Sequence, residues 1–351
     1  MQTTHSLLVS IGFNQLVAQA LARFTDASAV DTLQRVVEHH GDHVLVHDGR
    51  AARLARPLPA LARSAALAVG DWVLTHEDSN SDTWIQARLP PYTELSRITP
   101  DGSRQVLVSN VDVAFLVMAL DGDFNPRRLE RYLALVRSAG IHPVVLLTKA
   151  DLCDDVEGRL QELASRLPAS VDRHALNATA ADAVAPLVPY LGAGQTVVLL
   201  GSSGTGKSTL MNTLAGNTLQ KTAPVREDDS KGRHTTTSRL LRQLPSGACL
   251  IDTPGLRGLR LDIDATALAG LFEDIDALAA ACKFRDCAHE NEPGCAVRAG
   301  VAADRLANYH KLRREIERDR AGPLARRAEK ALGKRMERAI RAHYALKPGK
   351  K

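Results

Sequence analysis

The most constraining feature of this 351-residue chain is a glycine-rich octapeptide that follows a run of apolar residues. It comprises Gly201, Ser202, Ser203, Gly204, Thr205, Gly206, Lys207 and Ser208. This fits the pattern Gly-x4-Gly-Lys-Ser/Thr, whose glycines let backbone N–H groups curl around phosphates. Lys207 would reach the β- and γ-phosphates and Ser208 would ligate Mg²⁺. The flanking QTVVLL and Thr209-Leu-Met-Asn predict strand and helix, so we expect a phosphate loop in an α/β domain.

Two shorter motifs also follow predicted buried strands. Asp252 ends the run ACLI, where its carboxylate can hold Mg²⁺ through water and the N–H of Gly255 can meet the γ-phosphate. Thr148, Lys149 and Asp151 end the run VVLL. An aspartate there can accept hydrogen bonds from N1–H and the amino group of guanine, while the lysine stem lies against the base. We therefore expect GTP to be preferred over ATP.

The order of these motifs is the reverse of the usual one. In ordinary phosphate-loop GTPases the guanine-reading motif comes last, whereas here Asp151 precedes Lys207. The sequence therefore predicts a circularly permuted nucleotide domain. Asn177 and Ala178 then occupy the place of the loop that supports guanine O6, with asparagine instead of the usual serine.

The polar segment 227–239 lies between the phosphate loop and the Asp252 strand, where a switch loop belongs. Thr235 or Thr236 would complete the Mg²⁺ coordination there, and the sequence does not choose between them. Position 256 is leucine, although Ras-like proteins use a glutamine after this motif to orient the water. We therefore expect slow turnover without a partner.

A Cys/His cluster near residue 290 has the composition of a zinc site. Its members are Cys282, Cys287, His289 and Cys295. Three thiolates and one imidazole complete a tetrahedral site and leave no open position, so a structural zinc ion is expected and a catalytic one is not. Such an ion would stabilise a small helical domain. Cys153 and Cys249 lie in or beside apolar runs and are expected to pack there.

The rest of the chain predicts flanking domains. Short alternating runs over 33–100, separated by turns such as HHGD and HDGR, predict several short strands that suggest a small closed β-barrel, of which the OB type is one example. Any other small β-domain would fit this pattern equally well. We expect an N-terminal extension over 1–32, the barrel over 33–100 and the nucleotide domain over 101–262. A helical zinc-binding domain with a basic arm would occupy 263–351.

Positive charge is concentrated at the C-terminal end. Residues 311–351 hold 15 Lys and Arg against 5 Asp and Glu, although the whole chain has a net charge of +5. Such an arm favours a polyanionic partner through counterion release, with a merely solvated basic helix as the alternative. No apolar run approaches the roughly 18 residues of a membrane span, and the N-terminus lacks the basic flank of a signal peptide, so we expect a cytoplasmic protein.

Together the motifs give a resemblance to a known family. The chain resembles the ribosome small subunit-dependent GTPase A (RsgA) family in GDHVLVHDG, VGDWV, TKAD, GSSGTGKST, GRHTTT, DTPG and CKFRDCAHENEPGC. The resemblance implies an α/β, circularly permuted P-loop GTPase domain with an N-terminal OB-type β-barrel and a C-terminal helical zinc-binding domain. Departures are Thr148, Asn177, the Pro-rich stretch RPLPALARSAALA and Pro91-Tyr92, where the family tends to have basic residues.

The resemblance also implies a function. It suggests a monomeric GTPase that binds the small (30S) ribosomal subunit and its rRNA, acts late in subunit maturation and hydrolyses GTP to GDP with stimulation by the subunit, without a membrane partner. It further suggests His234 as a catalytic residue that the partner fixes against the water, beside Lys207. Two alternatives stay open: a GTP-dependent switch with a protein or membrane partner, and an RNA-binding module with negligible hydrolysis, which Leu256 favours.

Overall fold

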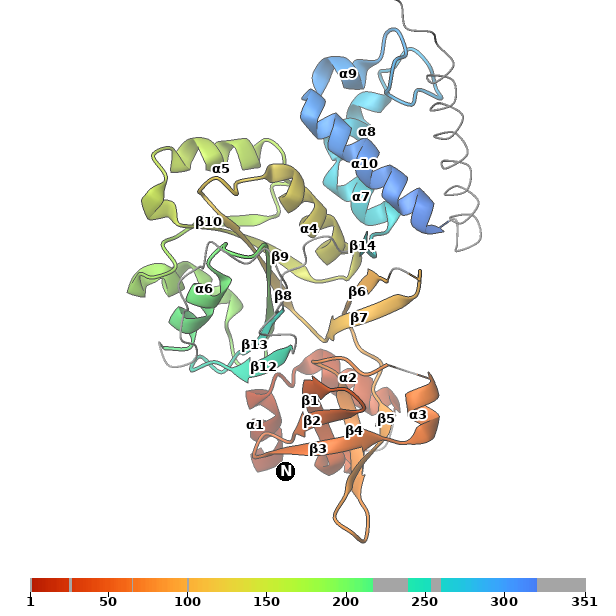
Figure 1. Ribbon diagram of the computed structural model, residues 1–351, viewed down its shortest axis with the longest axis vertical. Coiled ribbons are helices and arrows are strands. Elements are labelled where there is room, and N and C mark those ends of the chain that lie inside the picture. The colour runs from red at the N-terminus through yellow and green to blue at the C-terminus, as the bar shows by residue number, and fades with distance from the viewer. Residues whose placement is uncertain are drawn as a thin grey trace, which may run out of the picture. The chain divides into compact units, whose positions relative to one another are not determined.

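The computed structural model of the protein describes residues 2–24, 27–64, 66–99, 101–216, 239–253 and 260–320. The chain divides into two compact units (Figure 1). The first contains Met1–Arg97 and Gln105–Leu261, and the second contains Ile98–Arg104 and Asp262–Lys351. No helix among the described ranges is both long and apolar enough to cross a bilayer.

Five strands of the first unit close a small barrel. They are β1 (Leu33–His40), β2 (His43–His47), β3 (Ala52–Pro57), β4 (Trp72–Glu77) and β5 (Thr83–Arg88). Their order is β1-β2-β3-β5-β4, and β4 pairs back with β1. The β3–β5 pair is parallel and the short helix α3 (Pro59–Ser64) follows β3. This topology, with alternate apolar residues filling the interior, confirms the predicted OB-type barrel.

The N-terminal segment packs on this barrel. It forms α1 (Gln2–Ser10), α2 (Gln15–Phe24) and the 3₁₀ helix η1 (Ala27–Thr32), which lie beside the barrel strands (Figure 1). Val17 and Leu21 are one helical turn apart on α2, so both face inward. They share a buried cluster with Trp72 of the barrel. The N-terminal helices and the barrel therefore have a common core.

The nucleotide domain is built on five parallel strands. These are β8 (Val113–Ala119), β9 (His142–Thr148), β10 (Asp172–Ala175), β11 (Thr196–Gly201) and β13 (Cys249–Asp252), in the order β10-β9-β8-β11-β13. Four of them, β8, β9, β11 and β13, have near-continuous apolar sequences, which reflect burial on both faces. The edge strand β10 is the exception, because its sequence DRHA is polar and partly exposed. The strand β12 (Leu240–Gln243) pairs antiparallel with β13 on its other side in the sheet, and Leu240 of β12 pairs with Glu38 of β1. One eleven-stranded sheet therefore runs from the nucleotide domain into the barrel.

Helices cover both faces of the parallel strands (Figure 1). The elements are α4 (Pro126–Ser138), η2 (Ala150–Leu152), α5 (Val156–Ala164), η3 (Ala181–Tyr190) and α6 (Lys207–Leu214). Residues 113, 115 and 117 of β8 pack in one cluster with α6 and η3. Because side chains alternate along a strand, residues 114, 116 and 118 face the other side, and α4 packs against β8 and β9.

A buried arginine joins the barrel to the nucleotide sheet. Arg35 of β1 has no exposed surface. Its Nη1 donates to the carbonyl of Ile11 (2.6 Å) and to Oγ1 of Thr196 (2.8 Å), and Nη2 donates to the carbonyl of Asn110 (2.9 Å). Its Nε donates to the carbonyl of Gly70 (3.3 Å). A single guanidinium thus links the N-terminal turn, the barrel and the first residue of β11.

A smaller sheet has the order β14-β6-β7, formed by β6 (Glu94–Ile98), β7 (Arg104–Ser109) and β14 (Arg260–Leu261). The second unit contains α7 (Ala265–Leu271), α8 (Glu273–Ala279), α9 (Ala296–Gly300) and α10 (Ala303–Arg320). Arg305 of α10 lies 4.6 Å from the ring centre of Phe272 and binds both carboxylate oxygens of Asp274 (2.6 and 2.8 Å). Burial opposes ionisation of Asp274, but the hydrogen bond and the charge of Arg305, together with bonds from backbone N–H groups, outweigh it and lower the pKa of that carboxyl.

Candidate nucleotide site and metal centre

The predicted nucleotide motifs meet at one edge of the parallel sheet. All five strands end there, and the four that lead into predicted motifs end at Thr148 of β9, Ala175 of β10, Gly201 of β11 and Asp252 of β13. Because parallel strands place their carboxyl ends on the same edge, motifs that are distant in sequence become neighbours. The permuted order of the chain is therefore compatible with a single site.

The phosphate loop turns tightly between β11 and α6. Gly204 and Gly206 both have φ near +81°, a left-handed conformation that favours glycine. A Cβ at Gly201 would lie 2.3 Å from the carbonyl oxygen of Val117. The Nζ of Lys207 donates to the carbonyls of Gly201 (2.9 Å) and of the next residue (2.5 Å), so the ammonium lies against the loop backbone.

Both ends of the phosphate loop have accessible polar groups. Ser203 and Ser208 are exposed, and Thr209 is half-buried in the first turn of α6. Asp252 lies beside Leu199 on the neighbouring strand. Burial raises the pKa of the Asp252 carboxyl, and the positive charge of Lys207 partly opposes that rise. The carboxylate and the ammonium are thus close enough to interact.

The guanine-reading motif is tied to the phosphate loop. The buried Thr148 donates from Oγ1 toward the carbonyl of Thr205 (2.7 Å), with the carbonyl of Met118 at 3.3 Å. A hydroxyl has one proton, so the threonine makes one strong bond where an asparagine amide could donate two. Lys149 has φ +59°, and the side chain of Asp151 is exposed to solvent.

The loop after β10 lies next to the same motif. The N–H of Ala150 donates to the carbonyl of Leu176 (3.3 Å), and Thr213 of α6 donates from Oγ1 to the carbonyl of Ala178 (2.6 Å). Asn177 forms a turn in which its Oδ1 accepts from the N–H of Thr179 (3.0 Å). The structure therefore brings Asn177 and Ala178 to the site, next to the loop of Asp151.

Arg128 and Asp123 lie at this site but carried no sequence signal. Arg128 of α4 donates from Nη1 to Oγ of Ser202 (2.7 Å) and to both carboxylate oxygens of Asp123 (2.8 and 2.7 Å). In the sequence, Arg128 is one of several charged residues on an amphipathic helix, a pattern that is typical of a solvated face. Only the tertiary contact distinguishes it.

Several predicted site residues lie outside the described ranges. They are His234, Thr235, Thr236, Gly255 and Leu256. Most of the predicted basic arm, from residue 321 onward, lies outside them as well. The roles assigned to these residues stay predictions.

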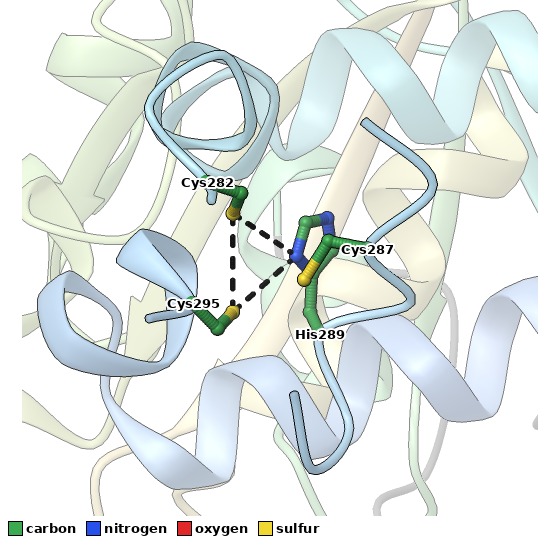
Figure 2. Close-up of side chains that lie close together, drawn as sticks. All are labelled: Cys282, Cys287, His289 and Cys295. Atoms are coloured by element: carbon green, nitrogen blue, oxygen red, sulfur yellow. Dashed lines mark hydrogen bonds between the residues drawn. The ribbon is translucent and has the colours of Figure 1, made fainter. Parts of the chain in front are cut away.

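The Cys/His cluster converges on one point (Figure 2). Its four ligand atoms all lie within 4.8 Å of one another. The Sγ atoms of Cys282 and Cys295 are 3.9 Å apart, and they lie 3.6 and 3.5 Å from Nδ1 of His289. A tetrahedral ion with Zn–S bonds of about 2.3 Å would separate two sulfurs by about 3.8 Å. The cluster therefore fits a tetrahedral metal ion, with Cys287 as the remaining ligand.

Backbone contacts hold the metal-binding loop. The carboxylate of Glu292 accepts from the N–H groups of Ala288 (2.9 Å), Glu290 (2.9 Å) and Asn291 (3.0 Å). The backbone N–H of Glu292 itself, together with these three N–H groups, lowers the pKa of the Glu292 carboxyl to about 2. Cys295 caps α9, since its Sγ accepts from the N–H of Arg298 (3.4 Å).

Comparison with known proteins gives consistent matches. A sequence model of the family described as RsgA GTPase matches residues 89–262. The "Small ribosomal subunit biogenesis GTPase RsgA" of Xanthomonas oryzae pv. oryzae (strain PXO99A) is 48% identical over 295 residues, covering 80% of each chain. The protein of the same name from Xanthomonas campestris pv. campestris (strain B100) is 47% identical over the same length and coverage.

Solved structures show the same architecture. YjeQ from Thermotoga maritima superposes with a TM-score of 0.60 at 24% identity, covering 81% of this chain and 98% of that one. YloQ, described as a circularly permuted GTPase, superposes with a TM-score of 0.57 at 26% identity, covering 81% of this chain and 94% of that one. The predicted permutation is confirmed. With this fold, these motifs and this degree of identity, the chain belongs to the RsgA GTPase family and is a GTP-hydrolysing enzyme.

Proposed function

We propose that this enzyme hydrolyses GTP while bound to the small ribosomal subunit and acts in the late maturation of that subunit. The identity of 48% to a small ribosomal subunit biogenesis GTPase, over 80% of both chains, carries the proposal. The small subunit is rich in RNA, so the basic C-terminal sequence is complementary to it.

The nucleotide would bind across the edge of the parallel sheet. Asp151 would accept the two N–H donors of guanine, and Asn177 and Ala178 would support O6. The backbone N–H groups from Ser202 to Gly206 would surround the phosphates. The bond from Thr148 to Thr205 supports this assignment, because it connects the base-reading loop to the phosphate loop.

Hydrolysis would depend on charge stabilisation around the γ-phosphate. Lys207 would neutralise charge on the β- and γ-phosphate oxygens. Ser208 and Asp252 would hold Mg²⁺, directly and through water, and the bound ion would neutralise charge that develops on the phosphates. Thr235 or Thr236 would complete that shell, and His234 would orient the water once the partner has ordered the switch loop.

The Cys/His cluster would hold one structural zinc ion. Three thiolates and an imidazole are the donor set that Zn²⁺ prefers, and the sulfur spacing of 3.9 Å suits its bond lengths. All four tetrahedral positions are protein ligands, so the ion would stabilise the helical unit without taking part in hydrolysis.

The metal-binding unit also offers an RNA-contacting loop. Lys283, Phe284 and Arg285 lie between the first two cysteines, and all three are exposed. The Nζ of Lys283 is 5.5 Å from the ring centre of Phe284. An exposed ring with cations beside it suits a base and its phosphates. This supports rRNA over the alternative of a protein or membrane partner.

We further propose that the protein acts as a cytoplasmic monomer. The absence of a membrane-spanning helix from the described residues is consistent with a soluble protein in contact with ribosomal subunits.

Turnover and co-sedimentation with purified ribosomal subunits test the function. We expect slow GTP hydrolysis by the enzyme alone, strong stimulation by small subunits and none by large subunits, with retention on the particle stronger with a non-hydrolysable GTP analogue than with GDP. ATP should neither be hydrolysed nor compete. Stimulation of GTP hydrolysis by anionic vesicles, or retention on the particle that does not depend on the nucleotide, would overturn the proposal.

A variant tests the role of His234. His234→Ala should bind the subunit but lose the stimulation of hydrolysis by it, and full stimulation would exclude a catalytic role for His234.

A further inference from the structure

The loop between β8 and α4 contacts both halves of the nucleotide site, although none of its residues belongs to a predicted motif. This β8–α4 loop comprises residues 120–125, and Arg128 follows on the first turn of α4. Asn125 caps the helix by accepting from the N–H of Arg128 (3.2 Å), and Pro126 occupies the first turn. The cap and the fixed φ of proline set the backbone direction from which Arg128 extends.

At the phosphate end, Arg128 connects Asp123 to the phosphate loop. One proton of its Nη1 is shared by the two Asp123 oxygens (2.8 and 2.7 Å), which leaves the other for Oγ of Ser202 (2.7 Å). Ser202 is only 1% exposed and follows Gly201 directly, so the bond from Arg128 ends on a buried side chain of the phosphate loop. The Arg128 side chain is 28% exposed, so this contact is partly shielded from water.

At the base end, the same loop holds the lysine of the guanine-reading motif. Oδ2 of Asp121 accepts from Nζ of Lys149 (2.6 Å), and Oδ1 accepts from the N–H of Asp123 (2.9 Å). The bond to Lys149 is the main reason that the pKa of Asp121 is lowered. A continuous chain of hydrogen bonds therefore runs from Lys149 through the β8–α4 loop to Ser202.

We propose that Asp121, Asp123 and Arg128 are positioning residues that hold the guanine-reading lysine and the phosphate loop in one fixed relation. Arg128 acts on the phosphates through Ser202, and Asp121 acts on the base through Lys149. This inference rests on the proposed function, because it takes the phosphate loop as the GTP site. If these pairs were ordinary surface ion pairs, their removal would change affinity very little.

Calorimetric titration with GDP and GMP separates the two ends of the chain of contacts. The variant Arg128→Met keeps the stem length but removes the donors. We expect about tenfold weaker binding of GDP, from the loss of a charge-assisted hydrogen bond. GMP, which lacks the β-phosphate, should be affected less, so the ratio of GDP to GMP affinity falls. In Asp121→Asn both nucleotides should weaken equally, because Lys149 contacts the base.

A matched control is available on the same helix. Arg137, in the last turn of α4, donates from Nη2 to Oγ of Ser170 (3.1 Å) at an exposed position. Arg137→Met therefore removes the same kind of bond away from the nucleotide and should leave both affinities unchanged. A general loss of folded protein would lower GDP and GMP binding in equal proportion, so it cannot mimic the expected change in ratio.

A second variant keeps the inference testable if Arg128→Met fails to fold. Ser202→Ala removes only a hydroxyl and should reproduce the selective loss for GDP, while the double variant should lose no more than either single one. Arg128→Lys should recover part of the affinity. If wild-type protein does not bind GDP, the proposed function fails. If it binds GDP and both Arg128→Met and Ser202→Ala behave like Arg137→Met, this inference alone is wrong.

Discussion

Replacing Arg35 by methionine should remove hydrogen bonds that join the barrel to the nucleotide sheet, and so lower the free energy of unfolding. Methionine fills the volume of the arginine stem but donates no hydrogen bond. Three of the four bonds of Arg35 are shorter than 3.0 Å, and they end on neutral acceptors of three different segments. A buried acceptor that loses its donor costs roughly 1–3 kcal/mol.

The expected loss is smaller than the sum of these bonds. Burying the guanidinium carries a desolvation cost, which the substitution removes. Arg35 also lies 5.3 Å from the ring centre of Trp72, a contact that adds about 1 kcal/mol. We therefore expect Arg35→Met to lower the free energy of unfolding by about 3 kcal/mol.

Urea unfolding measured by tryptophan fluorescence tests this value. The chain has 2 tryptophans, and the buried Trp72 reports directly on the Arg35 environment. The control is Arg53→Met, which removes an exposed arginine paired with Asp48 and Glu77 and should cost less than about 1 kcal/mol. If Arg35→Met lowers the free energy of unfolding no more than Arg53→Met does, the reasoning that Arg35 holds the barrel and the nucleotide sheet together is refuted.

Three further predictions concern the site, the metal and the barrel. Thr148→Ala removes the bond to Thr205 and should weaken GDP binding about fivefold in a fluorescent-nucleotide displacement assay; an unchanged Kd would show that the bond does not order the phosphate loop. Cys287→Ser should release zinc to a chelator that leaves wild type loaded, as measured by elemental analysis. The hydrogen bond from Trp84 lowers the pKa of Asp78 in the folded protein. The bond therefore stabilises the fold fully above the unfolded pKa of 3.8, and this stabilisation disappears as pH falls through the lower folded pKa. Trp84 fluorescence should follow that titration in wild type and not in Asp78→Asn.

Local sequence predicted the parts of the site that follow buried strands. The runs before Thr148, Gly201 and Asp252 are apolar because parallel strands are covered on both faces, and each motif begins where its strand ends. The residue types at each strand end then limit the chemistry that the site can perform. In the same way, the thiolates and imidazole of the Cys/His cluster limit that cluster to metal binding. For this reason the permuted domain and its flanking modules could be predicted before any contact was known.

The residues that connect these parts could not be predicted in the same way. Arg35 lies in a strand that reads as LQRVV, where an arginine normally faces water. Its burial depends on acceptors contributed by residues 11, 70, 110 and 196, which only the folded chain assembles. Arg128 likewise meets a serine 74 positions later in the sequence. Such contacts follow from strand order, and strand order depends on non-local pairing.

The pairing of β12 with β1 affects how the modules can be studied in isolation. A fragment that begins at residue 101 would leave β12 as the free edge of the parallel sheet, and it would also lose the arginine beside Thr196. A fragment that ends at residue 100 would expose the other side of the same junction. Free edges recruit foreign strands and promote aggregation. Separate contributions to RNA binding are therefore better assigned with point variants of the intact chain than with truncated pieces.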